Sequence, residues 1–223
     1  MLYIVATPIG NLEDIALRAL RTLKEADLIL AEDTRKTGLL LKHFSIKKPL
    51  KSFHDHNEAK MTPWVIEELK KGKDVALVSS AGTPTISDPG YKLVRACRKE
   101  SLRLTAVPGP SGVTNALSLS SCAHDKFVFL SYLPRKRGER RKTLEKIKGW
   151  QCAIVFFESP FRVLSALRDL KEIMGNKRLT IAREMTKKFE EVLEVATEEA
   201  IRHFESIKPK GEFTIVIDNK DSY

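Results

Sequence analysis

The feature of this sequence that most constrains its fold is a regular alternation of short apolar runs with longer amphipathic segments. In the first half, apolar runs typical of buried strands cover residues 2–6, 27–31, 74–79 and 102–107. Segments with the apolar spacing of helices follow them at 14–26, 34–44, 58–71, 90–100 and 111–121. Because strands separated by helices usually pair in parallel, the pattern predicts a parallel sheet covered by helices on both faces.

The same alternation restarts in the second half of the chain. Strands are predicted at 127–130, 153–157, 179–182, 192–196 and 213–217, and helices at 161–173 and 197–207. Small and polar residues at 121–126 interrupt the apolar pattern, so we predict a boundary there, between domains at 1–122 and 123–223. The predicted fold class is therefore α/β, with two α/β domains.

The charge balance of the 223 residues favours a polyanionic partner. The formal net charge is +10, and basic surfaces bind nucleic acid because binding releases its counterions. Lysine-rich surfaces are also common in stable cytosolic proteins, so charge alone leaves both interpretations open. No apolar run approaches the ~20 residues that a membrane helix needs, and the chain opens on a strand-like run rather than a signal peptide. We therefore expect a cytoplasmic protein without a membrane partner.

The cysteines and histidines indicate neither a disulfide scaffold nor a metal site. Cys97, Cys122 and Cys152 lie far apart and form no CxxC pair. The five histidines lack the spacing of metal ligands, apart from the pair His54 and His56. We expect buried, reduced thiols and no bound metal.

Three loops share one design, because each follows a predicted buried strand, precedes a helix and consists largely of small residues and prolines. They are ATPIGN at 6–11, SSAGTPTISDPG at 79–90 and VPGPSG at 107–112. In open α/β sheets ligands bind beyond the carboxyl ends of the strands, and small residues let the backbone approach them. None of the three has the GxGxxG or GxxxxGKS/T pattern of nucleotide-binding loops. Each alone is compatible with an ordinary turn, but three in one half-chain favour a ligand site.

Four ordered segments carry a resemblance to a known family. They are AGTPTISDPG at 81–90, VPGPSG at 107–112, FESPFR at 157–162 and AREMTK at 182–187. They resemble motifs of the tetrapyrrole methylase superfamily, and more narrowly of its RNA-modifying branch, the small-subunit ribosomal RNA methyltransferase I family. AEDTR at 31–35 and HDHNE at 54–58 also fit that branch, and the resemblance runs from Leu2 to about Ile217. Members of the family methylate the 2′-hydroxyl of a decoding-centre cytidine.

The resemblance implies two α/β domains with a cleft between them that binds S-adenosylmethionine, and a homodimer. By motif match the methyl donor contacts the second and third loops and two segments of the second domain. The matching residues are Ala81, Gly82, Thr83, Ile86, Ser111, Gly112, Glu158 and Met185. The first loop departs from the small-molecule methylases, which are richer in glycine there, so that either Pro8 or Ile9 takes the place facing the ligand.

Segment 134–149 carries a dense group of cations that we expect to contact RNA. It holds eight lysine and arginine residues against two glutamates. Because arginine makes bidentate contacts to phosphates, the predicted RNA contacts are Arg135, Arg137, Arg140 and Arg141. Tyr132 and Phe161 are candidates for stacking on a base, with a core or rim position as the alternative. For the segment as a whole, the alternative is a solvated helix face.

Methylation of a ribose hydroxyl requires help with removal of its proton, because the hydroxyl is a weak acid. Glu184 and Lys187 are the predicted catalytic residues, because their motif adjoins Met185. Glu184 and Lys187 are three residues apart, so they would share a face if the segment is helical, but an ordered loop is equally compatible with its position after a strand. The alternative to a catalytic role is a surface ion pair. Lys187 would stabilise the developing oxyanion, or act as a base if burial lowers its pKa. Asp33 is a further catalytic candidate, to orient the ribose or to accept the proton.

The expected function is S-adenosylmethionine-dependent 2′-O-methylation of a cytidine in small-subunit (16S) ribosomal RNA, as free RNA or within the small ribosomal subunit. One alternative is a tetrapyrrole methylase, which predicts a large apolar cleft and no use for the cations of segment 134–149. A second alternative, from another class, is a non-enzymatic RNA-binding module, which predicts that the methyl donor does not bind.

Overall fold

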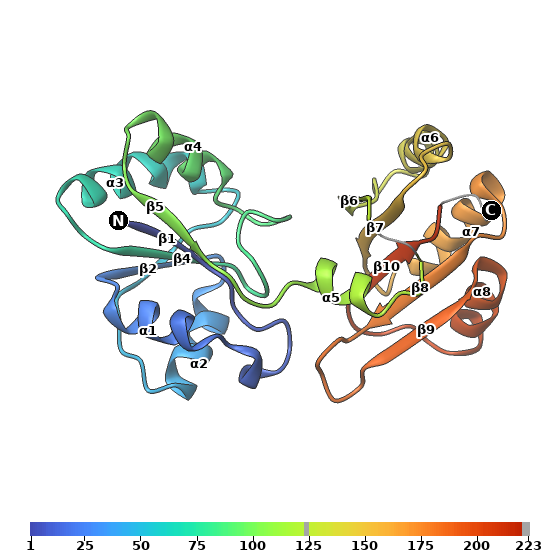
Figure 1. Ribbon diagram of the computed structural model, residues 1–223, viewed down its shortest axis with the longest axis horizontal. Coiled ribbons are helices and arrows are strands. Elements are labelled where there is room, and N and C mark those ends of the chain that lie inside the picture. The colour runs from blue at the N-terminus through green and yellow to red at the C-terminus, as the bar shows by residue number, and fades with distance from the viewer. Residues whose placement is uncertain (123–124, 220–223) are drawn as a thin grey trace. The chain divides into compact units, whose positions relative to one another are not determined.

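The structure is a computed structural model that describes residues 1–122 and 125–219 (Figure 1). The chain divides into two units, Met1–Ser111 and Gly112–Tyr223, each with a five-stranded sheet of its own. The predicted boundary between residues 122 and 123 adjoins Ala123 and His124, which lie outside the described residues.

The apolar runs of the first unit form a parallel sheet in the order β3-β2-β4-β1-β5, which confirms the predicted parallel pairing. Its strands are β1 (Leu2–Val5), β2 (Leu28–Ala31), β3 (Leu50–Ser52), β4 (Val75–Val78) and β5 (Leu104–Val107). The edge strand β3 was not predicted, because it has three residues and exposes Lys51 and Ser52. It therefore has no apolar run that periodicity would detect.

Helices cover both faces of this sheet. Beyond a short 3-10 helix at Leu12–Asp14, they are α1 (Leu17–Glu25), α2 (Thr34–His43), α3 (Glu58–Lys70) and α4 (Tyr91–Lys99). Leu23 of α1 packs in the cluster that contains Val5, whereas Leu93 of α4 packs in the opposite cluster with Ile4. The helices that follow the neighbouring strands β1 and β4 thus leave to opposite faces. In open α/β sheets such a switch point opens a crevice at the carboxyl ends of the two strands.

The second unit contains a mixed sheet in the order β6-β7-β10-β8-β9. Its strands, close to their predicted positions, are β6 (Phe127–Tyr132), β7 (Ala153–Glu158), β8 (Arg178–Arg183), β9 (Glu191–Ala196) and β10 (Phe213–Ile217). β6 and β7 are parallel, and β10 is antiparallel to both β7 and β8. β6, β7 and β8 therefore run in one direction, and the loops that follow them share one edge of the sheet.

One face of the second sheet is covered by α6 (Arg137–Ile147), α7 (Val163–Met174) and α8 (Thr197–Ser206). The sequence grouped α5 (Gly112–Ser118) with the first domain, but α5 contacts β7, β8 and β10 of the second sheet. A Cβ atom on Gly112 would lie 3.5 Å from the Phe157 ring, and Phe157 alternates with the core residue Phe156 along β7. The helix α5 thus packs on the face opposite to the other three.

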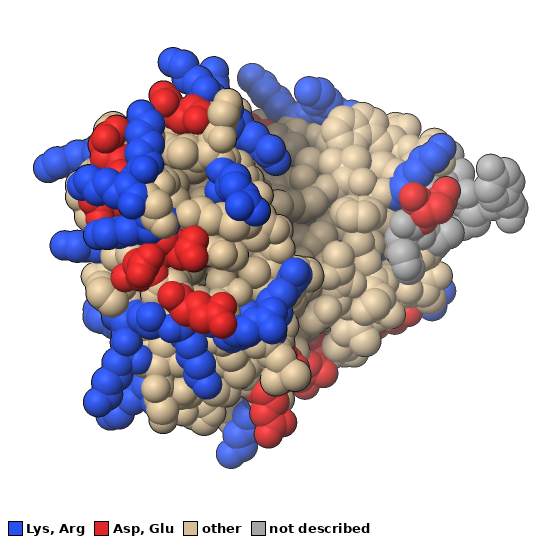
Figure 2. All heavy atoms as spheres, turned by 60° about the vertical axis from the view of Figure 1, so that its left-hand side comes forward, with Lys and Arg blue, Asp and Glu red and all other residues tan. Residues whose placement is uncertain are grey.

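Surface charge alone does not locate a binding site. On the first unit, which comes forward in Figure 2, lysine and arginine side chains are spread over the face in view with acidic side chains among them. The net charge of +10 is thus not gathered into one patch on that face. Among the described residues, every helix falls short of the length and apolar content that crossing a membrane requires.

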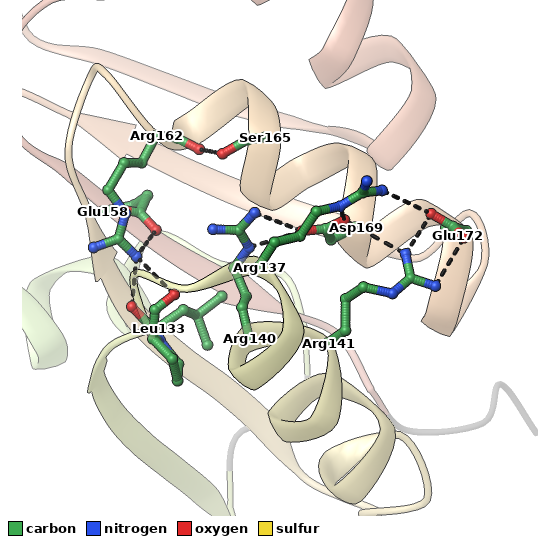
Figure 3. Close-up of polar contacts among 10 residues, drawn as sticks. Leu133, Arg137, Arg140, Arg141, Glu158, Arg162, Ser165, Asp169 and Glu172 are labelled. Atoms are coloured by element: carbon green, nitrogen blue, oxygen red, sulfur yellow. Dashed lines mark hydrogen bonds and ion pairs between the residues drawn. The ribbon is translucent and has the colours of Figure 1, made fainter.

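A buried carboxylate attaches the basic helix α6 to α7 (Figure 3). Asp169 on α7 is 1% exposed and pairs with Arg137, Arg140 and Arg141. Arg140 is also buried, and its Nε and Nη2 donate to Oδ2 of Asp169 at 2.8 and 2.6 Å. Burial opposes ionisation of Asp169, but hydrogen bonds from Arg137 and Arg140 lower its pKa overall. The charged carboxylate therefore fixes the position of the basic helix.

Replacement of Asp169 by alanine should destabilise the second unit strongly. The variant leaves the Arg140 guanidinium buried without its carboxylate, which costs about 3–5 kcal/mol of unfolding free energy. Glu172→Ala is the matched control, because it removes an exposed carboxylate of the same network and should cost less than about 1 kcal/mol. Urea unfolding followed by Trp150 fluorescence in a Trp64→Phe background reports on the second unit, since each unit has one tryptophan. Equal losses in the two variants would contradict the role of Asp169.

Candidate active site

The structure brings together the three loops that the sequence singled out. Loops 6–11, 79–90 and 108–111 follow β1, β4 and β5, whose parallel pairing places them at one edge of the first sheet. Thr7 and Gly82 exchange two backbone hydrogen bonds, of 2.9 and 3.0 Å. Thr83 Oγ1 donates to the carbonyl oxygen of Pro110 at 3.4 Å. The second loop is thus bonded to both of the others.

Loop 79–90 has an unusual backbone. Thr85 and Ser87 have φ angles of 73° and 66°, and Gly82 and Gly90 have φ angles of 75° and 128°. Residues with a Cβ rarely adopt positive φ, and such positions persist only where the surroundings impose them. A Cβ on Gly90 would lie 2.6 Å from Cδ2 of Leu77, so this glycine also permits a close approach to the core. Strain of this kind clusters at ligand-binding loops.

A buried glutamate from another element anchors the far end of this loop. Glu58, the first residue of α3, is buried, and its Oε1 accepts hydrogen bonds from the backbone N–H groups of Gly90 (3.0 Å) and Lys92 (2.9 Å). These N–H groups belong to the start of α4, where backbone donors have no partner within the helix. Glu58 therefore caps α4 and fixes the loop that leads into it. Glu58 lies within the segment HDHNE at 54–58, and its capping role was not predicted from the sequence.

The residues predicted to contact the donor differ in their accessibility. Ala81 is exposed, and the Ile86 side chain is 45% exposed. Gly82 is buried between the loops, since a Cβ there would lie 3.4 Å from Cγ2 of Ile9. Pro8 is buried and Ile9 is half-buried, so Ile9 is the more accessible of the two candidates in the first loop. Exposed small and aliphatic side chains on such a loop are typical of the mainly apolar lining of small-molecule sites.

Asp88, which was not predicted as a site residue, lies in the same loop. Burial, reinforced by the negative charge of Glu32 and to a lesser extent of Asp55, raises the pKa of Asp88 to about 7, against an opposing hydrogen bond from Ser79. Glu32 in turn accepts a hydrogen bond from the backbone N–H of Ser80 at 2.9 Å. Among the described residues, no three histidine, cysteine or carboxylate side chains gather as a metal site would require. Asp88 is therefore a carboxyl group that burial and nearby negative charge keep protonated up to about pH 7.

Asp33 has a structural role that the sequence did not assign. It is the N-cap of α2, and its Oδ1 accepts hydrogen bonds from the backbone N–H groups of Arg35 (2.9 Å) and Lys36 (3.4 Å). Hydrogen bonds from the side chain and backbone of Arg35 lower the pKa of Asp33 to about 2. Such a weak base is a poor proton acceptor at neutral pH.

In the second unit, Met185 is buried and lies beside Gly112, where its Cε would be 3.7 Å from an added Cβ. Glu158 is buried as well, but its carboxylate is occupied: it accepts hydrogen bonds from the N–H of Ser159 (2.8 Å) and from Nη2 of Arg162 (3.2 Å). Burial raises the pKa of Glu158, partly offset by these two donors. Ser111, at the end of the third loop, is half-buried. Gly112 and Met185, both predicted to contact the methyl donor, thus lie together. Glu158 instead stabilises the loop that follows β7 through its bonds to Ser159 and Arg162.

Glu184 and Lys187 form an ion pair in a loop after β8. Nζ of Lys187 donates to Oε1 of Glu184 at 2.8 Å and to Oε2 of Glu212 at 2.9 Å. Burial alone would lower the pKa of Lys187, but the two carboxylates raise it overall. Burial likewise opposes ionisation of Glu184, but the bonds from Lys187 and the Glu212 N–H lower its pKa. The pair is therefore charged, which favours Lys187 as a stabilising cation over Lys187 as a base.

The four arginines predicted to contact RNA have different environments. Arg135 and Arg137 are exposed. Arg141 is half-buried and makes a bidentate pair with Glu172, of 2.5 and 2.8 Å (Figure 3). Arg140 is 4% exposed and is committed to the carboxylate of α7 described above. Arg135 and Arg137 are therefore exposed to solvent, but Arg137 also pairs with Asp169 at 2.9 Å, and Arg140 lies inside the protein.

Asp88 should make the stability of the first unit depend on pH. The unfolded chain releases this proton near pH 3.8, whereas the folded protein holds it until about pH 7. The folded state thus binds more protons between these values, so the free energy of unfolding should fall as the pH rises through this window. Asp88→Asn removes that contribution, and its melting temperature should exceed that of the unaltered chain by more at pH 8 than at pH 4. Glu25→Gln controls for loss of one exposed carboxylate, and a pH-independent difference for Asp88→Asn would refute the prediction.

Comparisons with solved structures identify the same fold in tetrapyrrole methylases. The methyltransferase CobJ superposes with a TM-score of 0.70 at 15% identity, over 97% of this chain and 92% of that one. The cobalt precorrin-4 methyltransferase CbiF gives a TM-score of 0.68 at 17% identity, over 97% and 93%. A uroporphyrin-III C-methyltransferase from Thermus thermophilus, complexed with S-adenyl homocysteine, gives 0.67 at 16%, over 98% and 97%. These likenesses confirm the predicted fold class.

Sequence comparisons narrow the relationship. The model of the family "Tetrapyrrole (Corrin/Porphyrin) Methylases" matches residues 1–201. A relative from Thermotoga maritima, named ribosomal RNA small subunit methyltransferase I, is 52% identical over 220 residues, which are 99% of each chain. Relatives of the same name from Halalkalibacterium halodurans and Haemophilus influenzae are 46% and 44% identical over 97% and 99% of this chain, and 75% and 79% of theirs. The chain therefore belongs to the tetrapyrrole methylase family and, within it, to the ribosomal RNA small subunit methyltransferases I.

Proposed function

We propose that the chain transfers a methyl group from S-adenosylmethionine to a ribose 2′-oxygen of a cytidine in small-subunit (16S) ribosomal RNA. The observation that carries the proposal is the 52% identity, over nearly the whole of both chains, with a relative named for small-subunit ribosomal RNA methylation. The tetrapyrrole methylases resemble the chain in fold at 15–17% identity, which does not favour a tetrapyrrole as its substrate. A cytoplasmic location and a homodimer remain predictions.

The proposed donor site lies at the edge of the first sheet, at the switch point between β1 and β4. Loop 79–90 presents Ala81, Thr83 and Ile86 there, and Ile9 is the candidate from the first loop. The hydrogen bonds of Thr7 and Glu58 hold this loop in its strained conformation before a ligand arrives. A preformed loop loses little entropy on binding, which is the advantage of preorganisation. Gly112 and Met185 are proposed as donor contacts from the second unit.

The donor supplies an activated methyl group bound to a sulfonium sulfur. The residues of this chain have to position the ribose and deal with its hydroxyl proton. Lys187 is proposed to stabilise the negative charge that develops on the 2′-oxygen, because its ammonium group is already held by Glu184 and Glu212. Glu184 then acts by orienting Lys187. Asp33 is retained as a candidate for orienting the ribose, since its low pKa argues against proton transfer.

Single-turnover methylation of 16S ribosomal RNA tests both the function and the role of Lys187. Mass mapping of ribose methylation after incubation with protein and S-adenosylmethionine should locate one modified cytidine. Lys187→Ala should lower the single-turnover rate by about 100-fold or more, as expected for loss of a group that stabilises an oxyanion, with Glu184→Ala comparable. Donor affinity, measured by calorimetry, should stay nearly unchanged in both variants.

The control for this experiment is Arg168→Ala, which removes an exposed ion pair with Glu205 elsewhere in the second unit. Its rate should match that of the unaltered chain. Rates at the unaltered value in both Lys187→Ala and Glu184→Ala, with saturating RNA, would remove the pair from the catalytic site. Absence of donor binding by the unaltered chain would instead favour the alternative of a non-enzymatic RNA-binding module.

The exposed cations just before α6 should carry part of the RNA affinity. Arg135→Ser with Lys136→Ser should weaken RNA binding and reduce the slope of log affinity against log salt by about 0.7 for each lost contact to single-stranded RNA. Arg137 is left in place because it pairs with Asp169. The double variant Arg18→Ser with Arg21→Ser is the charge-matched control, because it removes two exposed arginines from α1 of the first unit. Fluorescence anisotropy at several salt concentrations measures these slopes of log affinity against log salt. Identical slopes in the two double variants would show that segment 134–149 does not contact RNA and is only a solvated surface.

A further inference from the structure

Two phenylalanines point into solvent from the edge of the second sheet that carries Lys187. Phe161, in the loop after β7, is 93% exposed, and Phe189, in the loop between β8 and β9, is 69% exposed. β7 and β8 run in the same direction with β10 between them, so their ends lie about 10 Å apart. Single exposed apolar side chains are ordinary on protein surfaces. Two aromatic rings beside proposed catalytic residues require a more specific explanation.

The loop that carries Phe161 is rigid although its ring is exposed. Nη2 of Arg162 donates to Glu158 at 3.2 Å and to the backbone carbonyl of Leu133, as Figure 3 shows. The other carboxylate oxygen of Glu158 accepts the N–H of Ser159 at 2.8 Å. Pro160 fixes one backbone angle immediately before Phe161. The ring is therefore presented by a preorganised loop and not by a flexible one.

The loop that carries Phe189 is also closed by its own hydrogen bonds. The N–H of Lys187 donates to the carbonyl of Glu184 at 3.0 Å, and the N–H of Glu190 donates to the carbonyl of Lys187 at 3.1 Å. The N–H of Thr186 donates to the carboxylate of Glu190 at 2.5 Å. Nζ of Lys188 lies 5.7 Å from the centre of the Phe189 ring, so a cation accompanies the exposed aromatic surface.

Exposed cations lie at the same edge of the sheet as these two rings. Arg135 and Lys136 follow β6, and Lys208 and Lys210 precede β10. Acidic side chains at this edge are committed in part to cations, as in the pair of Glu212 with Lys187. Aromatic rings for stacking together with mobile cations for phosphates are the combination by which proteins bind single-stranded nucleic acid.

We propose that this edge binds an unpaired stretch of RNA, whose bases stack on Phe161 and Phe189 while its phosphates contact the neighbouring cations. The inference rests on the proposed function and specifies its substrate: a single-stranded or splayed segment, not a duplex. In a duplex the base faces are covered by their neighbours, so that only base edges and backbone remain accessible. Stacking also explains why rings are exposed where polar side chains would be better solvated.

The test compares binding of a short fluorescein-labelled RNA, unpaired or annealed to its complement, by fluorescence anisotropy. Phe161→Ala and Phe189→Ala should each weaken binding of the unpaired RNA by roughly 5- to 150-fold, the range for loss of one stacking ring. Binding of the duplex should be weaker and nearly unaffected by either change. Phe161→Trp should restore binding, because tryptophan retains a stacking surface. Phe127→Ala is the matched control, since Phe127 is 45% exposed at the opposite end of the second sheet, where β6 begins.

Three results would overturn the proposal. The first is unchanged affinity for unpaired RNA in both alanine variants, and the second is equal loss for unpaired RNA and duplex. The third is a fall in sedimentation mass in Phe161→Ala or Phe189→Ala with RNA affinity intact, which would assign the rings to contact with a second copy of the chain. Methylation is measured separately with the unaltered protein. Stacking-dependent binding without methyl transfer refutes the proposed function alone, and methyl transfer without stacking-dependent binding refutes this inference alone.

Discussion

Parallel pairing of β1 with β4 and β5 is the constraint on which the candidate donor site depends. Parallel strands must end at the same edge, so loops that are about seventy residues apart in sequence, such as those of Thr7 and Gly82, are brought into hydrogen-bonding contact. The helices after β1 and β4 leave to opposite faces, and such a switch point opens a crevice at the carboxyl ends of the two strands. The loops at that point lie outside the two apolar clusters of the first sheet, so that their small residues are available for ligand binding.

Buried carboxylates give these loops their fixed shapes. Glu58 accepts two backbone N–H groups at the start of α4, Glu158 accepts one N–H and an arginine, and Asp169 accepts the arginines of α6. A buried charge is tolerated only where it is paired and fully hydrogen-bonded. Each carboxylate therefore imposes a particular geometry on the segment that satisfies it. In this way a small number of polar contacts orients segments that carry little apolar surface of their own.

The sequence predicted the elements and the loops well because both depend on local patterns. Strand and helix positions follow from apolar periodicity, and the three small-residue loops follow from composition at strand ends. The environment of single residues depends on distant partners instead. The pKa of Asp88 is raised first by burial and then by the negative charges of Glu32 and Asp55, which are far from it in sequence. The burial of Arg140 could have been predicted from the sequence, because Arg140, Leu144 and Ile147 are spaced as one buried helical face. It was not predicted because a charged side chain is normally expected at the surface.

The environment of Lys187 indicates how this site would contribute to the proposed reaction. A lysine whose ammonium is already bound by Glu184 and Glu212 does not have to reorganise when negative charge appears on a nearby oxygen. Preorganised charge is more effective than a mobile side chain, because no reorganisation is required at the moment of reaction. The same two carboxylates prevent Lys187 from losing its proton near neutral pH, since they raise its pKa. Its contribution is therefore electrostatic, and the proton of the ribose hydroxyl has to leave to another acceptor.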